Sequence, residues 1–222
     1  GTLLELASNA VHPEVWGPQV EYAREALALL EEKGEFGEDP PLLRQLKALI
    51  LRGELRDAAY TLGVSAEHVV FADLPFYEEG RYRRFKSTQA DIDAMTRLLQ
   101  DHKPHQIYIT GDSADPSSVA GICFRLLVAA LQACAGEEFA GSCSVWLYRG
   151  KERPLEPHEI DMAIPMSPLQ LERKANAISR YGALSSLEKE APETSRENAR
   201  LYDSLGLAEY EAIETFQRWR RS

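Results

Sequence analysis

Two aspartates lie in a loop that directly follows an apolar strand pattern near the middle of the chain. The strand is predicted over residues 106–110, and Asp112 and Asp115 come just after it. In open α/β sheets, the loops at the carboxyl ends of the strands bind ligands and carry chemistry. These carboxylates could therefore contact a substrate or hold a weakly bound cation. The alternative role is structural: Asp115 caps the next helix and Asp112 accepts hydrogen bonds from loop amides.

A catalytic zinc site would need more than this loop offers. Such a site has three protein ligands, drawn mostly from histidine and carboxylate groups, and an open position for water. Between Asp112 and Ala120 the chain has no histidine, and Ser117 and Ala120 cannot replace imidazole as zinc ligands. No Gly-x-Ser-x-Gly motif and no glycine-rich phosphate loop occurs elsewhere. The residues alone therefore identify no catalytic group and no cofactor.

Arg52 is a second candidate for ligand binding. It lies within an otherwise apolar helical pattern over residues 41–62. An arginine in that position either forms a helix ion pair or a solvated face, or it anchors an anionic or sugar substrate.

Helical and strand patterns alternate along most of the chain. Helices are predicted over 14–33, 41–62, 90–102, 116–134 and 169–181, and strands over 69–72, 106–110 and 144–148, with an irregular or edge strand over 160–168. This order favours one α/β domain over residues 1–222, Rossmann-like, with a mostly parallel sheet and helices on both faces. A C-terminal helical extension is predicted over about 194–221. Its apolar positions pack on the domain or form a partner interface.

Composition limits the partners and the compartment. The net charge of −10 and the pI near 5.1 argue against broad attraction to nucleic acid, although residues 81–86 form a local basic run with aromatics. No apolar run approaches the roughly 20 residues that span a bilayer. The three cysteines show no metal-type pairing and no complete disulfide framework. We therefore expect a cytoplasmic protein that binds neither nucleic acid nor membrane.

Several strings resemble the LmbE-like (PIG-L type) de-N-acetylase family, and most closely the C-terminal domain of bacterial proteins fused to a glucosamine-6-phosphate deaminase-like domain. The matching segments are residues 50–59 (ILRGELRDAA), 74–78 (LPFYE), 103–108 (KPHQIY), 111–116, 145–150 (VWLYRG), 159–168 (EIDMAIPMSP) and 205–212 (LGLAEYEA). The resemblance covers the chain from about residue 42 to its end.

The resemblance implies a Rossmann-like fold and a divalent metal, usually zinc, held by a His-Pro-Asp-Asp motif and a later histidine. That metal activates water to remove an N-acetyl group from an amino sugar or related glycoside. In the family's second motif, histidines stand at the positions of Ser117 and Ala120, and a later family histidine aligns near Tyr181. The chain begins at Gly1 without a His-Pro-Asp-Asp motif, so that motif could lie upstream.

We therefore expect a degenerate de-N-acetylase domain without catalytic zinc, in a binding, regulatory or structural role linked to amino-sugar metabolism. An amino sugar or glycoside is the expected ligand, with Arg52, Asp112 and Asp115 as its contacts. Two alternatives are open. One is an active metal-dependent deacetylase with a rearranged site, which would use zinc. The other is an oligomerisation or partner module, forming a homo-oligomer or serving a fused or associated deaminase-like domain. Whether the chain is an enzyme is left open.

Overall fold

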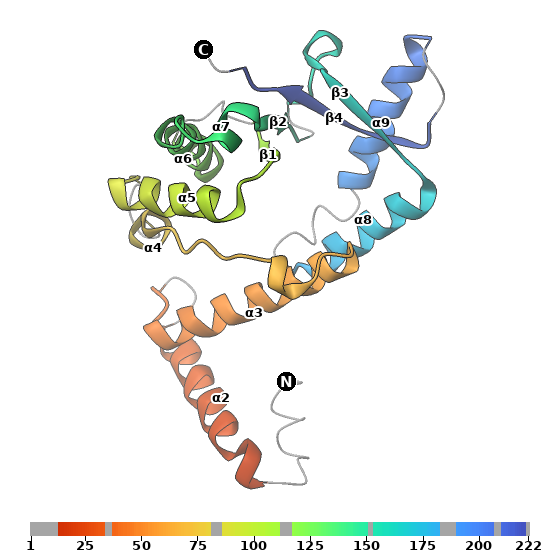
Figure 1. Ribbon diagram of the computed structural model, residues 1–222. Coiled ribbons are helices and arrows are strands. Elements are labelled where there is room, and N and C mark those ends of the chain that lie inside the picture. Colours follow the sequence, from red (N-terminus) through yellow and green to blue (C-terminus); the bar gives the residue numbers. More distant parts are fainter. Residues whose placement is uncertain are drawn as a thin grey trace.

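The fold alternates helices and short strands, as the computed structural model shows for residues 13–33, 37–80, 86–111, 117–150, 153–182, 190–206 and 210–220 (Figure 1). The α-helices are α2 (Pro13–Lys33), α3 (Pro41–Thr61), α4 (Pro75–Gly80), α5 (Gln89–His102), α6 (Val119–Ala133), α7 (Glu138–Ser142), α8 (Pro168–Arg180) and α9 (Glu190–Ser204). The strands are β1 (Gln106–Thr110), β2 (Ser144–Tyr148), β3 (Met162–Met166) and β4 (Ala212–Arg218), and two short 3₁₀ turns are η1 (Ala66–His68) and η2 (Pro157–Glu159).

The described strands form one mixed sheet in the order β1-β2-β4-β3. β1 and β2 run parallel, with Tyr108 opposite Trp146. β4 runs antiparallel to both of its neighbours, β2 and β3. The predicted α/β class is confirmed, but the sheet is mixed rather than mostly parallel. The reason is β4, which returns to the centre of the sheet from the C-terminal part of the chain.

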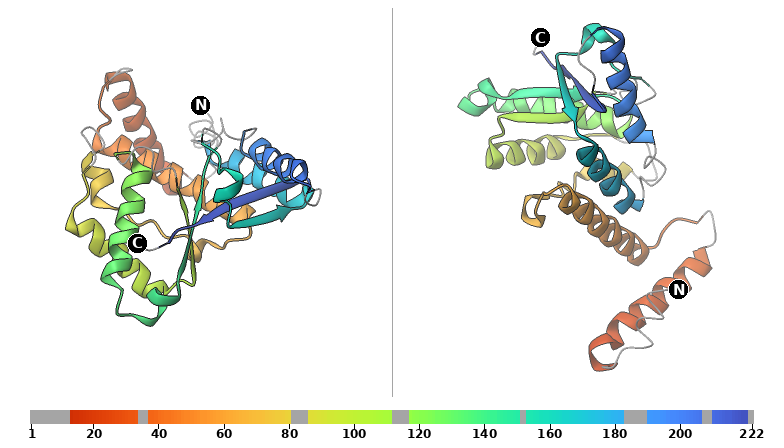
Figure 2. Two further views of the ribbon diagram at one scale, coloured as in Figure 1. Left: turned by 90° about the horizontal axis from the view of Figure 1, so that it is seen from above. Right: turned by 90° about the vertical axis from the view of Figure 1, so that its right-hand side faces the viewer.

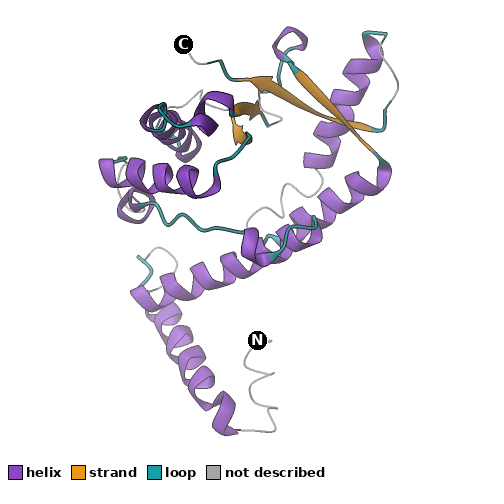
Figure 3. Ribbon diagram, viewed as in Figure 1, coloured by secondary structure: helices purple, strands orange, loops and turns teal. Residues whose placement is uncertain are grey.

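The helices lie on both sides of this sheet. Figure 2 shows α5 and α6 on one side, next to β1 and β2, and α8 and α9 on the other, next to β3 and β4. In Figure 3, which is coloured by secondary structure, α3 runs beside α8 and α2 extends away from the strands; these are the two longest described helices. None of the helices in the described ranges is long and apolar enough to cross a membrane.

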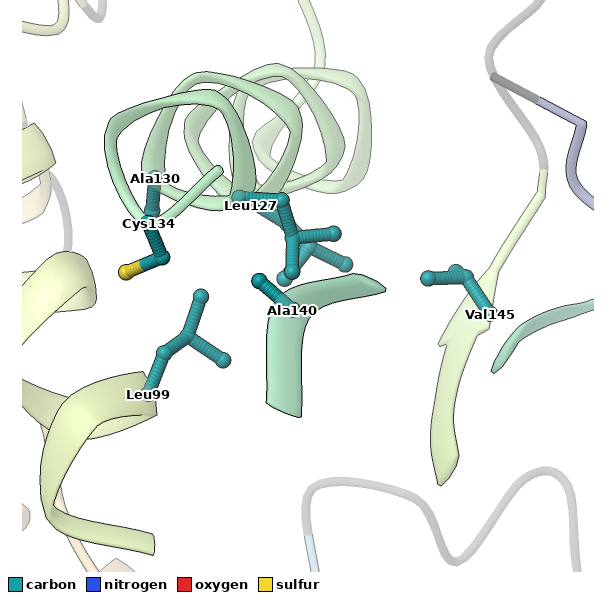
Figure 4. Close-up of a cluster of buried hydrophobic side chains, with 7 residues drawn as sticks. Leu99, Leu127, Ala130, Cys134, Ala140 and Val145 are labelled. Atoms are coloured by element: carbon teal, nitrogen blue, oxygen red, sulfur yellow. The ribbon is translucent and has the colours of Figure 1, made fainter. Parts of the chain in front are cut away.

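The larger cluster of buried hydrophobic residues lies between β2 and the helices α5, α6 and α7. Figure 4 shows this cluster of buried side chains, which consists of Leu99, Leu127, Ala130, Leu131, Cys134, Ala140 and Val145. A smaller cluster joins Phe76 of α4 to Ile122 and Leu126 of α6. Because α6 supplies residues to both clusters, it is the central helix of the core. Its apolar composition all around the helix is typical of such a buried position.

The C-terminal segment differs from the predicted helix over 194–221. α9 ends at Ser204, and Gly206 follows with a φ of +74°, a left-handed conformation that favours glycine. Residues 212–218 then form a strand. Ile213 and Phe216 are three residues apart, which fits a helix, but in β4 they point to opposite faces of the sheet. Because β4 carries apolar residues on both of its faces, some of them fall three residues apart, which is also the spacing of an apolar helix face.

Two smaller expectations were also wrong. Residues 69–72, predicted as a strand, pair with no strand among the described residues and run as an extended connection into α4. The helix predicted from residue 116 begins at Val119, because the hydroxyl of Ser118 caps it by accepting the backbone N–H of Gly121 at 3.0 Å. Asp115 is therefore not the N-cap residue. The prediction of one domain over residues 1–222 stays a prediction.

Candidate functional site

The carboxyl end of β1 is the expected place for chemistry, and its backbone is tightly packed against β2. The N–H of Gly111 donates to the carbonyl of Tyr148 at 2.7 Å, which extends the parallel ladder by one residue. A Cβ atom at position 111 would lie 2.8 Å from the Cβ of Leu147. Position 111 therefore needs glycine, because any side chain would collide with the neighbouring strand.

The next described residues lead into α6. Ser117 is exposed, Ser118 caps the helix, and Ala120 is half-buried in its first turn. Ser117 and Ala120 are the two positions where the resemblance places family histidines. A hydroxyl and a methyl group there provide no nitrogen donor for a zinc ion.

Asp112 and Asp115 lie outside the described residues, so their predicted role as ligand contacts stays a prediction. Within the ranges that the structure does describe, no group of three His, Cys, Asp or Glu side chains is arranged to hold a metal ion. The donors present in those ranges do not fit a catalytic zinc.

Arg52 is fixed by an ion pair and by an aromatic ring. Its guanidinium pairs with the carboxylate of Asp73 and lies 5.1 Å from the centre of the Phe71 ring. Arg56 approaches the same ring at 4.9 Å. The Arg52 and Asp73 side chains are 37% and 60% exposed, so the pair is open to solvent. The structure thus pairs Arg52 with a residue of the connection that follows α3, and not with a residue of its own helix. Its role in ligand binding stays a prediction.

The end of α8 contacts α3, the helix that carries Arg52. The carboxylate of Glu54 accepts the backbone N–H of Gly182 at 3.1 Å, and Asp57 pairs with Arg180 at 3.2 Å. Tyr181, which aligns near a later family histidine, lies between these two contacts. Polar residues of α3 therefore hold the position where that histidine would stand.

A second polar cluster lies at the carboxyl end of β2. Arg149 follows the strand, and its guanidinium donates to both carboxylate oxygens of Glu159, at 3.0 and 3.1 Å. It also donates to the side-chain oxygen of Gln217 on β4 at 3.2 Å. A planar guanidinium that binds a carboxylate through two bonds is a strong and directional pair. The backbone N–H of Glu156 and the nearby Arg149 hold the pKa of Glu159 below its usual range.

This cluster borders a shallow groove of about 380 Å³. The groove is lined by Leu147, His158, Glu159, Asp161, Gln217, Arg218, Trp219 and Arg220. Asp161 accepts the backbone N–H of Arg218 at 2.8 Å and pairs with Arg220 at 3.6 Å. Donors, acceptors and an indole ring lie together there, an arrangement that suits a small polar ligand better than an apolar one.

Sequence reasoning did not identify Arg149, Glu159 or Gln217 as a group. Arg149 carried a usable signal, because it stands directly after an apolar strand. Gln217 carried none, since its segment was predicted as a helix. Of the basic run at 81–86, only Lys86 lies within the described residues.

Comparisons with known proteins support the fold and indicate one relationship. No protein-family model matches the sequence. The chain is 36% identical over 200 residues to a protein of Bacteroides thetaiotaomicron named as glucosamine-6-phosphate deaminase-like. That match covers 84% of this chain but only 30% of the relative. The crystal structure of GalB, the 4-carboxy-2-hydroxymuconate hydratase of Pseudomonas putida KT2440, superposes with a TM-score of 0.56 at 16% identity, covering 77% of this chain and 72% of the hydratase. The chain therefore shares its α/β fold with that hydratase and is homologous to under a third of the deaminase-like protein.

Proposed function

We propose that this chain is an LmbE-like (PIG-L type) domain that keeps the de-N-acetylase scaffold but not the catalytic zinc. Its role is then binding, regulatory or structural, linked to amino-sugar metabolism, in the cytoplasm. The observation that carries this proposal is the start of α6. The helix begins directly after the loop that follows β1, and the two positions expected to hold histidine are Ser117 and Ala120.

The chemical consequence follows from what zinc does in such a hydrolase. A bound zinc lowers the pKa of its water ligand, so that hydroxide is present near neutral pH. Loss of histidine ligands weakens the metal site, and the hydrolytic route then has no activated water. Asp112 and Asp115 alone would hold zinc far more weakly.

The link to amino sugars is supported by the relative from Bacteroides thetaiotaomicron. Its name refers to glucosamine-6-phosphate deaminase, and it is about three times as long as the segment matched here. We infer that a deaminase-like domain, fused or associated, is the functional partner of this chain. The amino-sugar ligand of that partner is also the ligand expected here.

Arg52, Asp112 and Asp115 are the proposed ligand contacts. Because Arg52 already pairs with Asp73, a sugar phosphate would bind by replacing that carboxylate on the guanidinium. Such an exchange would cost little free energy, because solvent-exposed ion pairs contribute only about 0–1 kcal/mol to stability. The stacking on Phe71 would keep the guanidinium in place during the exchange.

Calorimetric titration tests this assignment with glucosamine 6-phosphate and N-acetylglucosamine 6-phosphate as probes. We expect one of them to bind, and Arg52→Gln to abolish that binding. Arg56→Gln is the matched control, because Arg56 stacks on the same ring and is not a proposed contact. Binding that survives Arg52→Gln would remove Arg52 from the site. No binding of either sugar would contradict the ligand class.

A hydrolase with a rearranged site makes the opposite prediction. It would release acetate from N-acetylated amino sugars, and Asp115→Ala would abolish that release without unfolding the protein. Acetate release with this dependence on Asp115 would overturn the proposed loss of catalysis.

A further inference from the structure

The shallow groove of about 380 Å³ at the end of β4 combines charges of both signs. Its lining includes two carboxylates, of Glu159 and Asp161, and two guanidinium groups, of Arg218 and Arg220. Glu159 is in addition held by Arg149 through two hydrogen bonds. A fully charged ligand gains little from such a lining, because attraction to one group is offset by repulsion from its neighbour. The groove therefore favours a ligand without net charge.

The side-chain amide of Gln217 supplies donors in this lining. A guanidinium can only donate hydrogen bonds, so the atom of Gln217 that faces Arg149 at 3.2 Å is the amide oxygen. That contact fixes which end of the amide points elsewhere. Among the residues that the structure describes, none accepts a hydrogen bond from the amide N–H groups of Gln217. These N–H groups are available to a ligand in the groove.

Asp161 supplies a fixed acceptor in the same lining. Its backbone N–H donates to the carbonyl of Phe216 at 3.0 Å, and its Oδ2 atom accepts the backbone N–H of Arg218 at 2.8 Å. The other carboxylate oxygen, Oδ1, lies 3.6 Å from the guanidinium of Arg220, which is too long for a hydrogen bond. Oδ1 is therefore held in place and can still accept a hydrogen bond.

The indole of Trp219 adds an apolar surface beside these polar groups. The backbone N–H of Trp219 donates to the carbonyl of Val145 at 2.9 Å, and the ring packs edge-to-face on Phe124 with the ring centres 6.0 Å apart. These contacts fix the ring, which is only half-buried. An aromatic surface next to a few fixed donors and acceptors is the usual composition of a small-molecule site.

We propose that this groove binds a neutral sugar ring. A sugar hydroxyl both donates and accepts hydrogen bonds, so hydroxyls of one ring can accept from Gln217 and donate to Asp161. The C–H face of the ring then packs on the indole of Trp219. Inorganic phosphate would be repelled by the Asp161 carboxylate, and an apolar ligand would leave both polar side chains without partners. This site goes beyond the proposed function, because it shares no residue with the ligand contacts proposed above.

NMR titration of the 222-residue chain tests the proposal, with the methyl glycosides of glucose, galactose and mannose as probes. We expect at least one of them to shift the indole N–H resonance of Trp219 and the side-chain amide resonances of Gln217. Because the groove is shallow, a dissociation constant of about 1 mM is expected. Inorganic phosphate at the same concentration should shift neither set of resonances.

Gln217→Glu is the informative variant, because it keeps an oxygen for Arg149 and removes the donors. We expect it to weaken sugar binding by roughly tenfold while the rest of the spectrum stays that of a folded protein. Gln132→Glu is the matched control, at an exposed residue of α6 that does not line the groove, and should bind as the wild type does. Arg52→Gln should also leave binding unchanged, which separates this site from the one in the proposed function.

Each of the following results would overturn the proposal. Unshifted Trp219 and Gln217 resonances at roughly ten times the expected constant would show that the groove binds no sugar. Shifts caused by phosphate instead would show that it selects anions. Equal binding by the wild type and by Gln217→Glu would remove the amide from the site. Loss of binding in Arg52→Gln would place the sugar at the site of the proposed function.

Discussion

The carboxylate of Asp91, in the first turn of α5, accepts the backbone N–H of Phe76 from α4 at 2.8 Å. Its other oxygen accepts the backbone N–H and the hydroxyl of Thr88, at 2.8 and 2.9 Å. Asp91 is fully buried. One side chain thus caps α5 and fixes α4, whose Phe76 fills the small core cluster.

Replacing Asp91 by alanine should destabilise the protein strongly. The change leaves the backbone N–H groups of Phe76 and Thr88 without their acceptor, and we expect the free energy of unfolding to fall by about 2–4 kcal/mol. Urea denaturation followed by circular dichroism measures this. Asp93→Ala, at an exposed position on the same helix, is the control and should change stability by about 0.5 kcal/mol or less. Equal effects of the two changes would contradict the role of Asp91.

The same carboxylate should make stability depend on pH. Burial by itself raises the pKa of Asp91, but the hydrogen bonds from Phe76 and Thr88 outweigh it and leave the pKa below its usual value. Its contribution is therefore fully present above the pKa of an unfolded aspartate and is lost as the pH falls through the lower folded value. Acid titration of the wild type and of Asp91→Asn should show a steeper loss of stability for the wild type. Parallel curves would contradict this.

Asp39 should titrate at an unusually low pH. Hydrogen bonds from Lys33, at the end of α2, and from Lys47 of α3 lower its pKa from 3.8 to about 2. The link between the two helices should be intact above about pH 4 and be lost as the pH falls through 2. Carboxyl NMR titration measures the pKa, and Lys47→Met should raise it. Arg97→Met removes an equal charge from α5 and should leave it unchanged. An ordinary pKa in the wild type would show that the Lys33 and Lys47 contacts do not form.

A partly buried network joins the two helices next to β3 and β4. Lys174 of α8 donates to the hydroxyl of Ser195 at 2.9 Å and pairs with Glu214 of β4, and Ser195 donates to that same carboxylate at 2.7 Å. Ser195 is 1% exposed, too buried to act as a nucleophile, so its role is structural.

We expect Ser195→Ala to lower the free energy of unfolding by about 1–3 kcal/mol, because Lys174 and Glu214 each lose a partner. Ser204→Ala, at the exposed end of the same helix, should change it by about 0.5 kcal/mol or less. Thermal unfolding of the two variants measures the difference. A Ser195→Ala variant as stable as the wild type would contradict the network.

Two glycines should respond in opposite directions to alanine. At position 111 the new Cβ meets the Cβ of Leu147 at 2.8 Å, and we expect a loss of about 1–3 kcal/mol through displacement of β1 from β2. At Gly53, within α3, a new Cβ meets nothing within 4 Å, and the change should stabilise by about 0.5–1 kcal/mol. Denaturant unfolding compares them. Similar shifts for both would contradict the close approach at Gly111.

The sequence patterns predicted the elements whose periodicity is set by one buried face. α5 and β1 match their predicted bounds within one residue, because their apolar residues and end signals agree. β4 was missed because a strand buried on both faces shows no alternation, and its neighbours are far away in the sequence. Its antiparallel pairing also could not be read locally, since it depends on where the chain returns.

The sequence predicts those features of the candidate site that follow from the identity of single residues, and it does not predict contacts between residues that are far apart in the sequence. The absence of histidine at Ser117 and Ala120 is visible in the sequence. The link between Arg149, Glu159 and Gln217 spans 68 residues and depends on β4 lying beside β2. The pairing of Arg52 with Asp73 likewise depends on an extended connection after α3 that was predicted as a strand.

We propose that the zinc chemistry of the resembled family has been lost at Ser117 and Ala120. The most direct test of this proposal is metal analysis of the protein purified without chelator, combined with an assay of acetate release from N-acetylglucosamine 6-phosphate. We predict far less than stoichiometric zinc and no acetate. One tightly bound zinc per chain together with acetate release would contradict the account.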